Sequence, residues 1–148
     1  MFVIIPYQSV GPIRFGMSAN ELTQAVGEPI RIRKNHLGEP NYKYPTFSVR
    51  LSVKDQTVVE VGLIPKAAVR LGDVDIFGSP TAFEDLIKTD GNPMESPGGF
   101  IVLLNLGITM TGFHDSDPSQ KAVTAFVKGH WDDLRSELKA YVHPSPSA

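Results

Sequence analysis

Cysteine is absent from the 148-residue chain. This absence excludes disulfide bonds, thiolate nucleophiles and Cys-ligated zinc. The chain also has little net charge, formally −2, which argues against a general affinity for nucleic acid. It has no apolar run long enough to cross a membrane. The residues that are present, 41% hydrophobic and 20% charged, are typical of one globular domain with a buried core.

The spacings of known catalytic and metal sites are missing as well. The segment His114–Pro118 holds an imidazole and two carboxylates, but a calcium loop needs further oxygen ligands and a bidentate Glu at fixed spacing, so we predict a polar turn. Gly98-Gly99 precedes an expected strand, whereas a phosphate cradle precedes a helix. No Gly-x-Ser-x-Gly elbow occurs. The sequence therefore predicts no enzyme, no cofactor and no metal, although an acid–base site assembled from scattered side chains would leave no local pattern.

The first residues, Met1–Pro6, are apolar but lack the basic region and the cleavage site of a signal peptide. We interpret Phe2–Ile5 as a strand that Pro6 ends, and we expect a cytoplasmic protein.

The clearest local signal is a capped helix over 19–26. Ser18 is a good N-cap, and Glu21 three residues later can complete a capping box. Gly27 is a natural left-handed terminator, and Pro29 prevents the helix from continuing. So short a helix is unstable alone, and it is expected to pack on a sheet.

Alternating residues predict two neighbouring strands, Phe47–Val53 and Thr57–Ile64, joined by a hairpin turn. The segment 30–45 is broken by several Asn, Gly and Pro residues and is interpreted as irregular. The polar positions of the strands in both halves are expected to form one wet sheet face. Its predicted members are Ser48, Arg50, Ser52, Glu60, Thr109 and Thr111.

The second half follows the same order. Ser79 is predicted to cap a helix whose apolar stripe contains Phe83, Leu86 and Ile87. Predicted strands follow over Phe100–Leu106, Gly107–Phe113 and Ala122–Val127, with a polar loop over His114–Gln120. A last helix is predicted over 131–142, before a disordered tail over 143–148. The matching order favours an internal duplication, with repeat one over about 1–65 and repeat two over about 66–130.

Basic and aromatic residues gather in the segment before the first alternating strand. They are Arg31, Arg33, Lys34 and His36, followed by Tyr42 and Tyr44. Such a cluster can contact phosphate or RNA, but it is more typical of a solvated edge strand protected against aggregation. We favour a role for the cluster in a protein interface over a role in nucleic-acid binding, because Tyr and Arg are enriched at binding hot spots. The single Trp, Trp131, is expected to pack in the core.

One pattern also resembles a known family. It runs Ile-Pro-x-x-Ser-Val-Gly-Pro-Ile-Arg-Phe-Gly-Met-Ser-x-x-Glu-Leu over 5–22 and Val-Gly-Glu-Pro over 26–29. It resembles small bacterial tandem-repeat proteins that look like immunity proteins carried beside toxins. Their repeat is similar to that of beta-lactamase inhibitory protein and of small outer-membrane assembly lipoproteins. Weaker echoes lie in 75–78, 105–108 and 122–131, and the lipobox cysteine of the lipoprotein branch is missing. The resemblance implies a protein-binding module without catalysis.

The sequence thus predicts an α+β fold of two sequential helix-plus-antiparallel-strands repeats, with the helices on one face of the sheet and a C-terminal helix. All 148 residues are expected to form a single domain. The expected function is inhibition of a protein toxin or effector by occlusion, with no nucleic-acid or membrane partner. The alternative is a small-molecule-binding protein or enzyme with a pocket between the sheet and the last helix. Partner-binding residues are expected to be Tyr42, Tyr44, Arg50, Glu60, Thr109 and His114.

Overall fold

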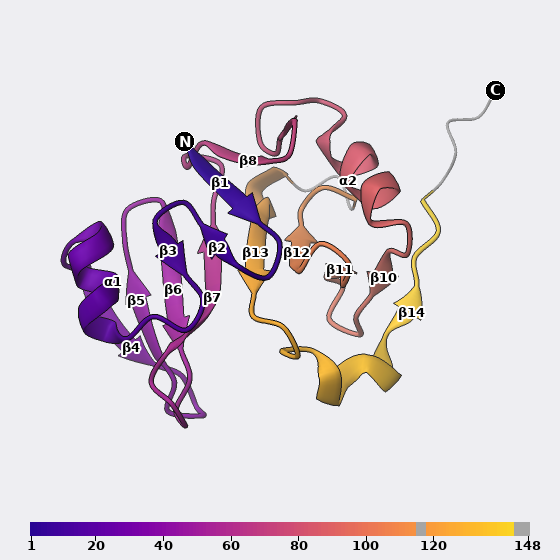
Figure 1. Cartoon of the computed structure of the whole chain (residues 1–148). Helices are drawn as coiled ribbons and strands as arrows, with labels where there is room; N and C mark the ends of the chain where they lie inside the picture. Colours follow the sequence, from indigo (N-terminus) through magenta and orange to yellow (C-terminus); the bar gives the residue numbers. More distant parts are fainter. Residues whose placement is uncertain (115–117, 144–148) are drawn as a thin grey trace.

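The computed structural model describes residues 1–114 and 118–143. These residues form two sheets of mostly antiparallel strands together with short helices, an α+β arrangement (Figure 1). In residues 1–114 and 118–143, no helix has the length and apolar character needed to cross a membrane.

The smaller sheet has the strand order β3-β2-β1-β8-β9. β1 pairs with β2 in the antiparallel sense and with β8 in the parallel sense, while the remaining pairings in the described chain are antiparallel. The bounds are Phe2–Ile5 for β1, Ser9–Val10 for β2, Ile13–Arg14 for β3, Val69–Leu71 for β8 and Val74–Asp75 for β9.

The larger sheet has the strand order β14-β10-β11-β12-β13-β7-β6-β5-β4, antiparallel throughout its described length. Its first-half strands are β4 (Arg31–Lys34), β5 (Pro40–Lys43), β6 (Phe47–Leu51) and β7 (Val58–Leu63). Its second-half strands are β10 (Met94–Glu95), β11 (Ile101–Leu103), β12 (Ile108–Thr111), β13 (Ala122–Phe126) and β14 (Lys139–Ala140). The long strands predicted for both halves are present but shorter, because turns take up their ends.

The first helix, α1 (Ala19–Val26), has the predicted bounds and the predicted capping box. Glu21 N donates to Ser18 Oγ at 3.2 Å, and Ser18 N donates to Glu21 Oε1 at 3.1 Å. The second helix, α2 (Ala82–Asp90), does not start as predicted. Its N-cap is Thr81, and Ser79 Oγ only accepts a bond from Thr81 N at 3.3 Å.

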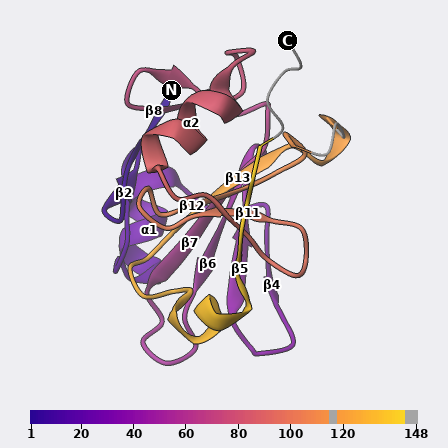
Figure 2. The ribbon, with the colours of Figure 1, turned by 90° about the vertical axis from the view of Figure 1, so that its right-hand side faces the viewer.

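Both halves follow one order: a hairpin, a helix and a set of antiparallel strands. The hairpin β2–β3 leads into α1 and then β4–β7, and the hairpin β8–β9 leads into α2 and then β10–β13. Seen from the side, α1 and β2 lie on one side of the larger sheet and β4 lies at its far edge (Figure 2). Leu22 of α1 and Leu86 of α2 pack into a single core with the inward residues of both sheets.

The segment 30–45, predicted to be irregular, is a hairpin of β4 and β5. Asn35 forms its turn, because its Oδ1 accepts bonds from Leu37 N and Glu39 N, both at 2.9 Å. Of the residues interpreted as breakers of regular structure, Asn35 and Gly38 lie in the turn, whereas Pro40 and Asn41 belong to β5 itself.

The predicted C-terminal helix over 131–142 is wrong. The chain forms a short 3₁₀ helix, η2 (Asp132–Glu137), and then β14, which pairs with β10. Tyr141 N donates to Pro93 O at 2.9 Å, so pairing with the second-half sheet holds this segment extended. His143, predicted to be in the disordered tail, contacts Tyr141 and Glu84. The rest of that tail, 144–148, lies outside the described residues, as do 115–117 of the predicted polar loop, whose end forms the 3₁₀ turn η1 (Pro118–Gln120).

Candidate binding face

Strand register sorts the residues of the larger sheet onto two faces. One face carries Val49, Val61 and Ile108 into the core beneath α1, α2 and the smaller sheet. The opposite face, called here the open face, carries one residue of each strand in a continuous row. From β14 to β4 the row is Ala140, Met94, Val102, Thr109, Thr124, Gly62, Ser48, Lys43 and Arg31.

The chemistry and exposure of this row change from one side of the sheet to the other. Val102 is fully buried and Thr109 is only 9% exposed. Ser48 is half-buried, and Lys43 and Arg31 at the end of the row are exposed. The open face is therefore closed at β11 and β12, lined with hydroxyls in the middle, and accessible and cationic over β4 and β5.

A hollow of about 390 Å³ lies in the middle of the open face. Gly62 sits at its centre, where the missing side chain leaves space between the Ser48 and Thr124 hydroxyls. Within the described residues, the side chains of Asn41, Ser48, Thr109 and Thr124 bond to no other protein group, so they are free for a ligand. The lining residues are Asn41, Ser48, Arg50, Glu60, Gly62, Phe100, Thr109, Thr124 and Trp131.

A charged cluster adjoins these hydroxyls. Arg50 and Glu60 are directly opposite in β6 and β7, and Arg50 Nη1 lies 2.8 Å from Glu60 Oε2. His130 Nε2 lies 3.4 Å from the other carboxylate oxygen, and its ring stacks on Phe126. Glu60 is thus fixed between two basic side chains and presents a charge of defined orientation.

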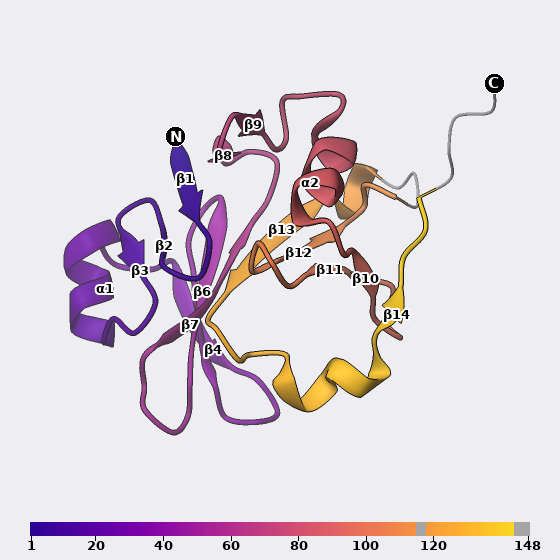
Figure 3. The ribbon, with the colours of Figure 1, turned by 45° about the vertical axis from the view of Figure 1, so that its right-hand side comes forward.

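Two aromatic residues border the hollow. Phe100 precedes β11 and is 44% exposed, and Trp131 lies in the segment that follows β13. Figure 3 shows this segment running below the ends of β11 and β12 before it returns to β14. The half-buried Trp131 ring packs against Phe126, so the prediction that it is a core residue is only partly right. Apolar rings beside free polar groups are the usual composition of a recognition surface.

Trp131 also lines a second hollow, of about 540 Å³, between the sheet and η2. The Tyr7 hydroxyl donates to the Leu104 carbonyl at its wall, and burial raises the pKa of that hydroxyl. Lys128 and Arg135 supply positive charge, and Asp132 lies 3.7 Å from Arg135. The arrangement offers an aromatic wall and two cations to a small ligand.

The predicted partner-binding residues separate into two groups. Arg50, Glu60 and Thr109 meet in the central hollow. Tyr44 is 3% exposed, and its hydroxyl donates to Gly27 O at 2.9 Å, while burial raises its pKa. Tyr42 is opposite Val49 and packs against the core. Tyr44 is therefore buried and wrong as a surface anchor, whereas Tyr42 is half-buried and lies on the core face of the sheet.

His114, the sixth predicted residue, lies away from the open face. Its ring packs near Phe83 and Tyr141, and its Nε2 lies 3.8 Å from Glu95. This aromatic cluster joins α2 to the C-terminal segment, so His114 has a packing role. Of the other predicted face residues, Thr111 shares the open face opposite Ala122, whereas Ser52 lies beyond β6 and accepts a turn bond from Asp55 N.

Sequence reasoning missed five residues of the hollow: Asn41, Gly62, Phe100, Thr124 and Trp131. Thr124 alternates with two buried residues of β13, a signal that was readable. Gly62 left no signal, because its contribution is an absent side chain. In the residues that the structure describes, no group of three His, Asp or Glu side chains is placed to hold a metal ion. No protein-family profile, curated protein sequence or solved structure matches the chain.

Proposed function

We propose that this chain is a protein-binding module that receives its partner on the open face of the larger sheet. The observation that carries the proposal is the central hollow, where unbonded hydroxyl and amide groups lie between two partly exposed aromatic rings. Such groups gain hydrogen bonds only when a partner supplies them. The Arg50–Glu60 pair places a positive and a negative charge at fixed positions on the open face. Fixed charges of this kind favour one complementary partner over nonspecific binding.

The size of the face suits a protein partner. A stable interface buries roughly 1,600 Å² in total, more than one hollow of this volume can supply. The hollow would then accept one protruding loop, while the exposed β4 and the open-face residues of β5 and β6 would supply the remaining contact area. Partner binding on this scale needs little change of shape, because the face is built on paired strands.

Because the first-half motif resembles that of bacterial immunity proteins, we propose that the partner is a bacterial toxin or effector. The chain would inhibit this partner by covering its active surface. Such an inhibitor acts in the cytoplasm of the cell that it protects. The shared order of the two halves and the symmetric strand orders of both sheets support two copies of one folding unit. In the smaller sheet β2 and β8 flank β1, and in the larger sheet β7 lies beside β13, with four strands of each half on either side of that contact and β14 added at the second-half edge.

The test is to co-express the chain with the toxin encoded by the neighbouring gene, then to measure cell survival and the affinity of the purified pair. Gly62→Leu would place a side chain in the hollow. The Gly62 backbone is not left-handed, and a Cβ there lies 3.3 Å from the Ser48 hydroxyl, so this first atom needs only a small shift of that group. We expect this variant to bind at least about 100-fold more weakly. Gln24→Leu, which adds the same side chain to the exposed surface of α1, is the matched control.

Unchanged affinity of Gly62→Leu, with Gln24→Leu also unchanged, would show that the partner binds elsewhere. Absence of any complex and of any protection would end the toxin proposal itself.

One observation favours a second candidate, a small-molecule-binding protein. The 540 Å³ hollow lies between the sheet and the C-terminal segment and has the size of ordinary ligand pockets. Its two cations, Lys128 and Arg135, fit an anionic ligand with an aromatic group for Trp131. A thermal-shift screen of aromatic carboxylates tests this candidate. Stabilisation that Arg135→Ala abolishes would support it, and no hit at millimolar concentration would remove it.

A further inference from the structure

The strand β4 forms one edge of the larger sheet and, within the described chain, is paired on one side only. β4 is the last strand in the order, and all four of its residues are exposed. Asn35 N donates to Glu39 O at 3.1 Å, which fixes the phase of the ladder with β5. Because antiparallel bonds alternate, the N–H and C=O groups of Ile32 and Lys34 point away from β5. Within the described chain nothing bonds to them, so they can pair with another strand.

This edge carries positive charge without an internal partner. The strands β4, β5 and β6 contain no acidic residue, and in the described part of the chain only Arg50 among their cations pairs with a carboxylate. Arg31 lies directly opposite Lys43 on the open face. Like charges directly opposite each other destabilise a sheet. The presence of Arg31 opposite Lys43 is therefore not explained by a contribution to the stability of the folded chain.

Apolar side chains lie next to these cations. Ile30, Ile32 and Leu37 are 63%, 51% and 64% exposed. A strand that only guards against aggregation is usually charged and lacks exposed branched residues. Along this edge the arginines alternate with Ile30 and Ile32, so they lie on opposite faces of the strand. This alternation suits the binding of an extended segment that places charged side chains on one face and apolar side chains on the other.

We propose that the partner adds an extended acidic segment to the free edge of β4, with carboxylates at every second position opposite Arg31 and Arg33. This rests on the proposed protein-binding function and gives the chemistry of the partner. Main-chain bonds to Ile32 and Lys34 supply the pairing, as in other cases of strand addition. A second copy of this chain fits poorly, because an antiparallel pair in which the outward-facing Ile32 residues lie opposite each other places Arg31 opposite Arg33 twice.

The test uses a fluorescein-labelled peptide of four Glu-Val repeats, with fluorescence anisotropy and two-dimensional NMR as readouts. Its controls are a Lys-Val peptide and a peptide of the same composition with the four valines before the four glutamates. We expect only the alternating acidic peptide to shift the amide signals of β4. Arg31→Glu with Arg33→Glu should weaken it at least about tenfold, and added salt should weaken it further. Lys54→Glu with Lys66→Glu, which changes the net charge equally on exposed residues elsewhere, should have little effect.

Two N-methylated versions of the peptide test the main-chain bonds. In an added strand only alternate N–H groups face β4, so methylating all valines or all glutamates should block binding in one case only. Equal affinities for the two methylated peptides would overturn strand addition. Binding of a twelve-residue oligothymidine that the acidic peptide cannot displace would also overturn the proposal, because the edge would then recognise phosphate.

The two proposals fail in different ways. If Gly62→Leu abolishes binding of the partner and the Arg31/Arg33 reversal does not, the open face is the site and the acidic edge is wrong. If neither variant affects a complex that forms, both proposals fall.

Discussion

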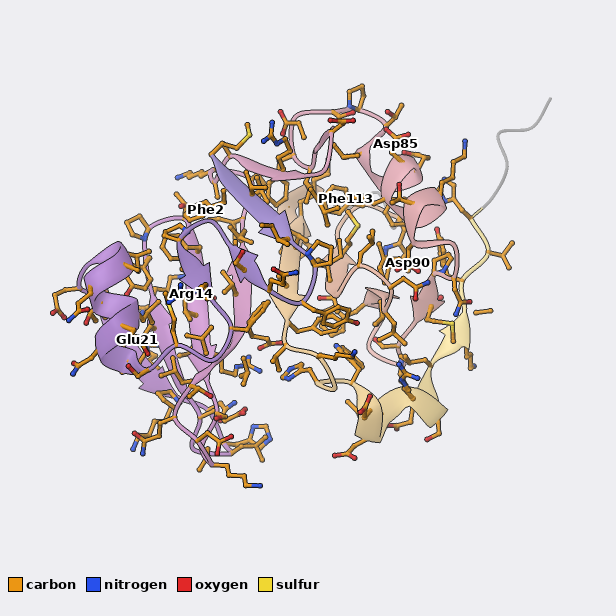
Figure 4. The ribbon with its side chains drawn as sticks, in the orientation of Figure 1. Phe2, Arg14, Glu21, Asp85, Asp90 and Phe113 are labelled. Carbon is orange, nitrogen blue, oxygen red and sulfur yellow. The ribbon has the colours of Figure 1, made fainter. Side chains whose placement is uncertain are left out.

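The α-helices α1 and α2 are held by different means. α1 is secured locally, by the reciprocal bonds between Ser18 and Glu21. α2 has no side-chain bond at its N-cap, but its last residue, Asp90, is buried and accepts N–H bonds from Asn92, Asn105 and Leu106 at 2.9–3.1 Å. Figure 4 shows Glu21 and Asp90 well apart, each beside its own helix. The first half therefore depends on neighbours in sequence, and the second on contacts between distant turns.

Loss of the Asp90 carboxylate should have the largest effect. Asp90→Ala leaves Asn92 N and Asn105 N without an acceptor and leaves Leu106 N only its bond to Leu103 O at 3.2 Å. Asn105 and Leu106 belong to the turn between β11 and β12. We expect the free energy of unfolding to fall by about 3 to 5 kcal/mol. Urea unfolding measures the loss, and hydrogen exchange should show the amides of Asn105 and Leu106 exposed first. Asp133→Ala, at an exposed position, is the control and should change stability by less than about 0.5 kcal/mol.

The turns of the two hairpins offer a matched pair. Gly11 in the first and Gly72 in the second have left-handed φ values of 56° and 57°. A Cβ at Gly11 would lie 2.7 Å from Phe2 Cδ1, whereas a Cβ at Gly72 meets nothing within 4 Å. Both alanine variants should lose about 1 to 2 kcal/mol from backbone strain, and Gly11→Ala about 1 kcal/mol more from displacing Phe2. Equal melting temperatures would show that Phe2 moves freely.

The helix starts give a smaller contrast. Ser18→Ala removes the cap of α1 and should cost about 1 kcal/mol. Thr81→Ala at the start of α2 should cost only a few tenths of a kcal/mol, because the Thr81 side chain makes no cap bond. Its hydroxyl instead donates to Asp85 Oδ2 at 3.0 Å and lies 3.4 Å from the Ser79 hydroxyl, all at exposed positions. Thermal unfolding of both variants measures the difference, and a larger loss for Thr81→Ala would reverse the comparison.

The smallest expected effects concern how the free energy of unfolding depends on pH, and Glu21 and Asp90 should contribute to it with opposite signs. Bonds from Ser18 lower the pKa of Glu21, so its contribution is present above its ordinary value of 4.5 and is lost as pH falls through the lowered pKa. Burial raises the pKa of Asp90 and outweighs its amide bonds, so its contribution is fullest below 3.8 and declines as pH rises through the raised pKa.

The stability advantage of the wild type over Glu21→Gln should therefore shrink on acidification, while its advantage over Asp90→Asn should grow. Chemical unfolding between pH 3 and pH 7 measures both. Parallel trends in the two series would contradict the assigned causes.

The contrast between contacts local in sequence and contacts distant in sequence also explains how much of the fold could be predicted from the sequence. The bounds of α1 follow from residues three apart in sequence, and β6 from residues two apart, so local reading found both. Asp90 could not be found, because its partners lie about fifteen residues away, across a turn. The cap of α2 was misplaced at Ser79 for the same reason, since packing rather than a local bond sets where that helix begins.

The candidate site was half predictable. Alternation placed Arg50 and Glu60 on the outer face correctly, because a strand fixes which side a residue takes. It misplaced Tyr44, because the turn at Asn35 was interpreted as the end of regular structure rather than the middle of a hairpin. The depth of the hollow at Gly62 depends on three neighbouring strands at once, which no local pattern encodes.

The parallel pairing of β1 with β8 has a consequence for synthesis. The third residue of β1 and the last residue of β8, Ile4 and Leu71, lie opposite each other although the chain places a complete half-molecule between them. A nascent chain halted after β7 would leave one side of β1 and one side of β7 unpaired, since β8 and β13 are still to come. Both sheets should therefore be completed only once β8 and β13 have been synthesised, and the two halves, expressed as separate polypeptides, should reassociate by fragment complementation.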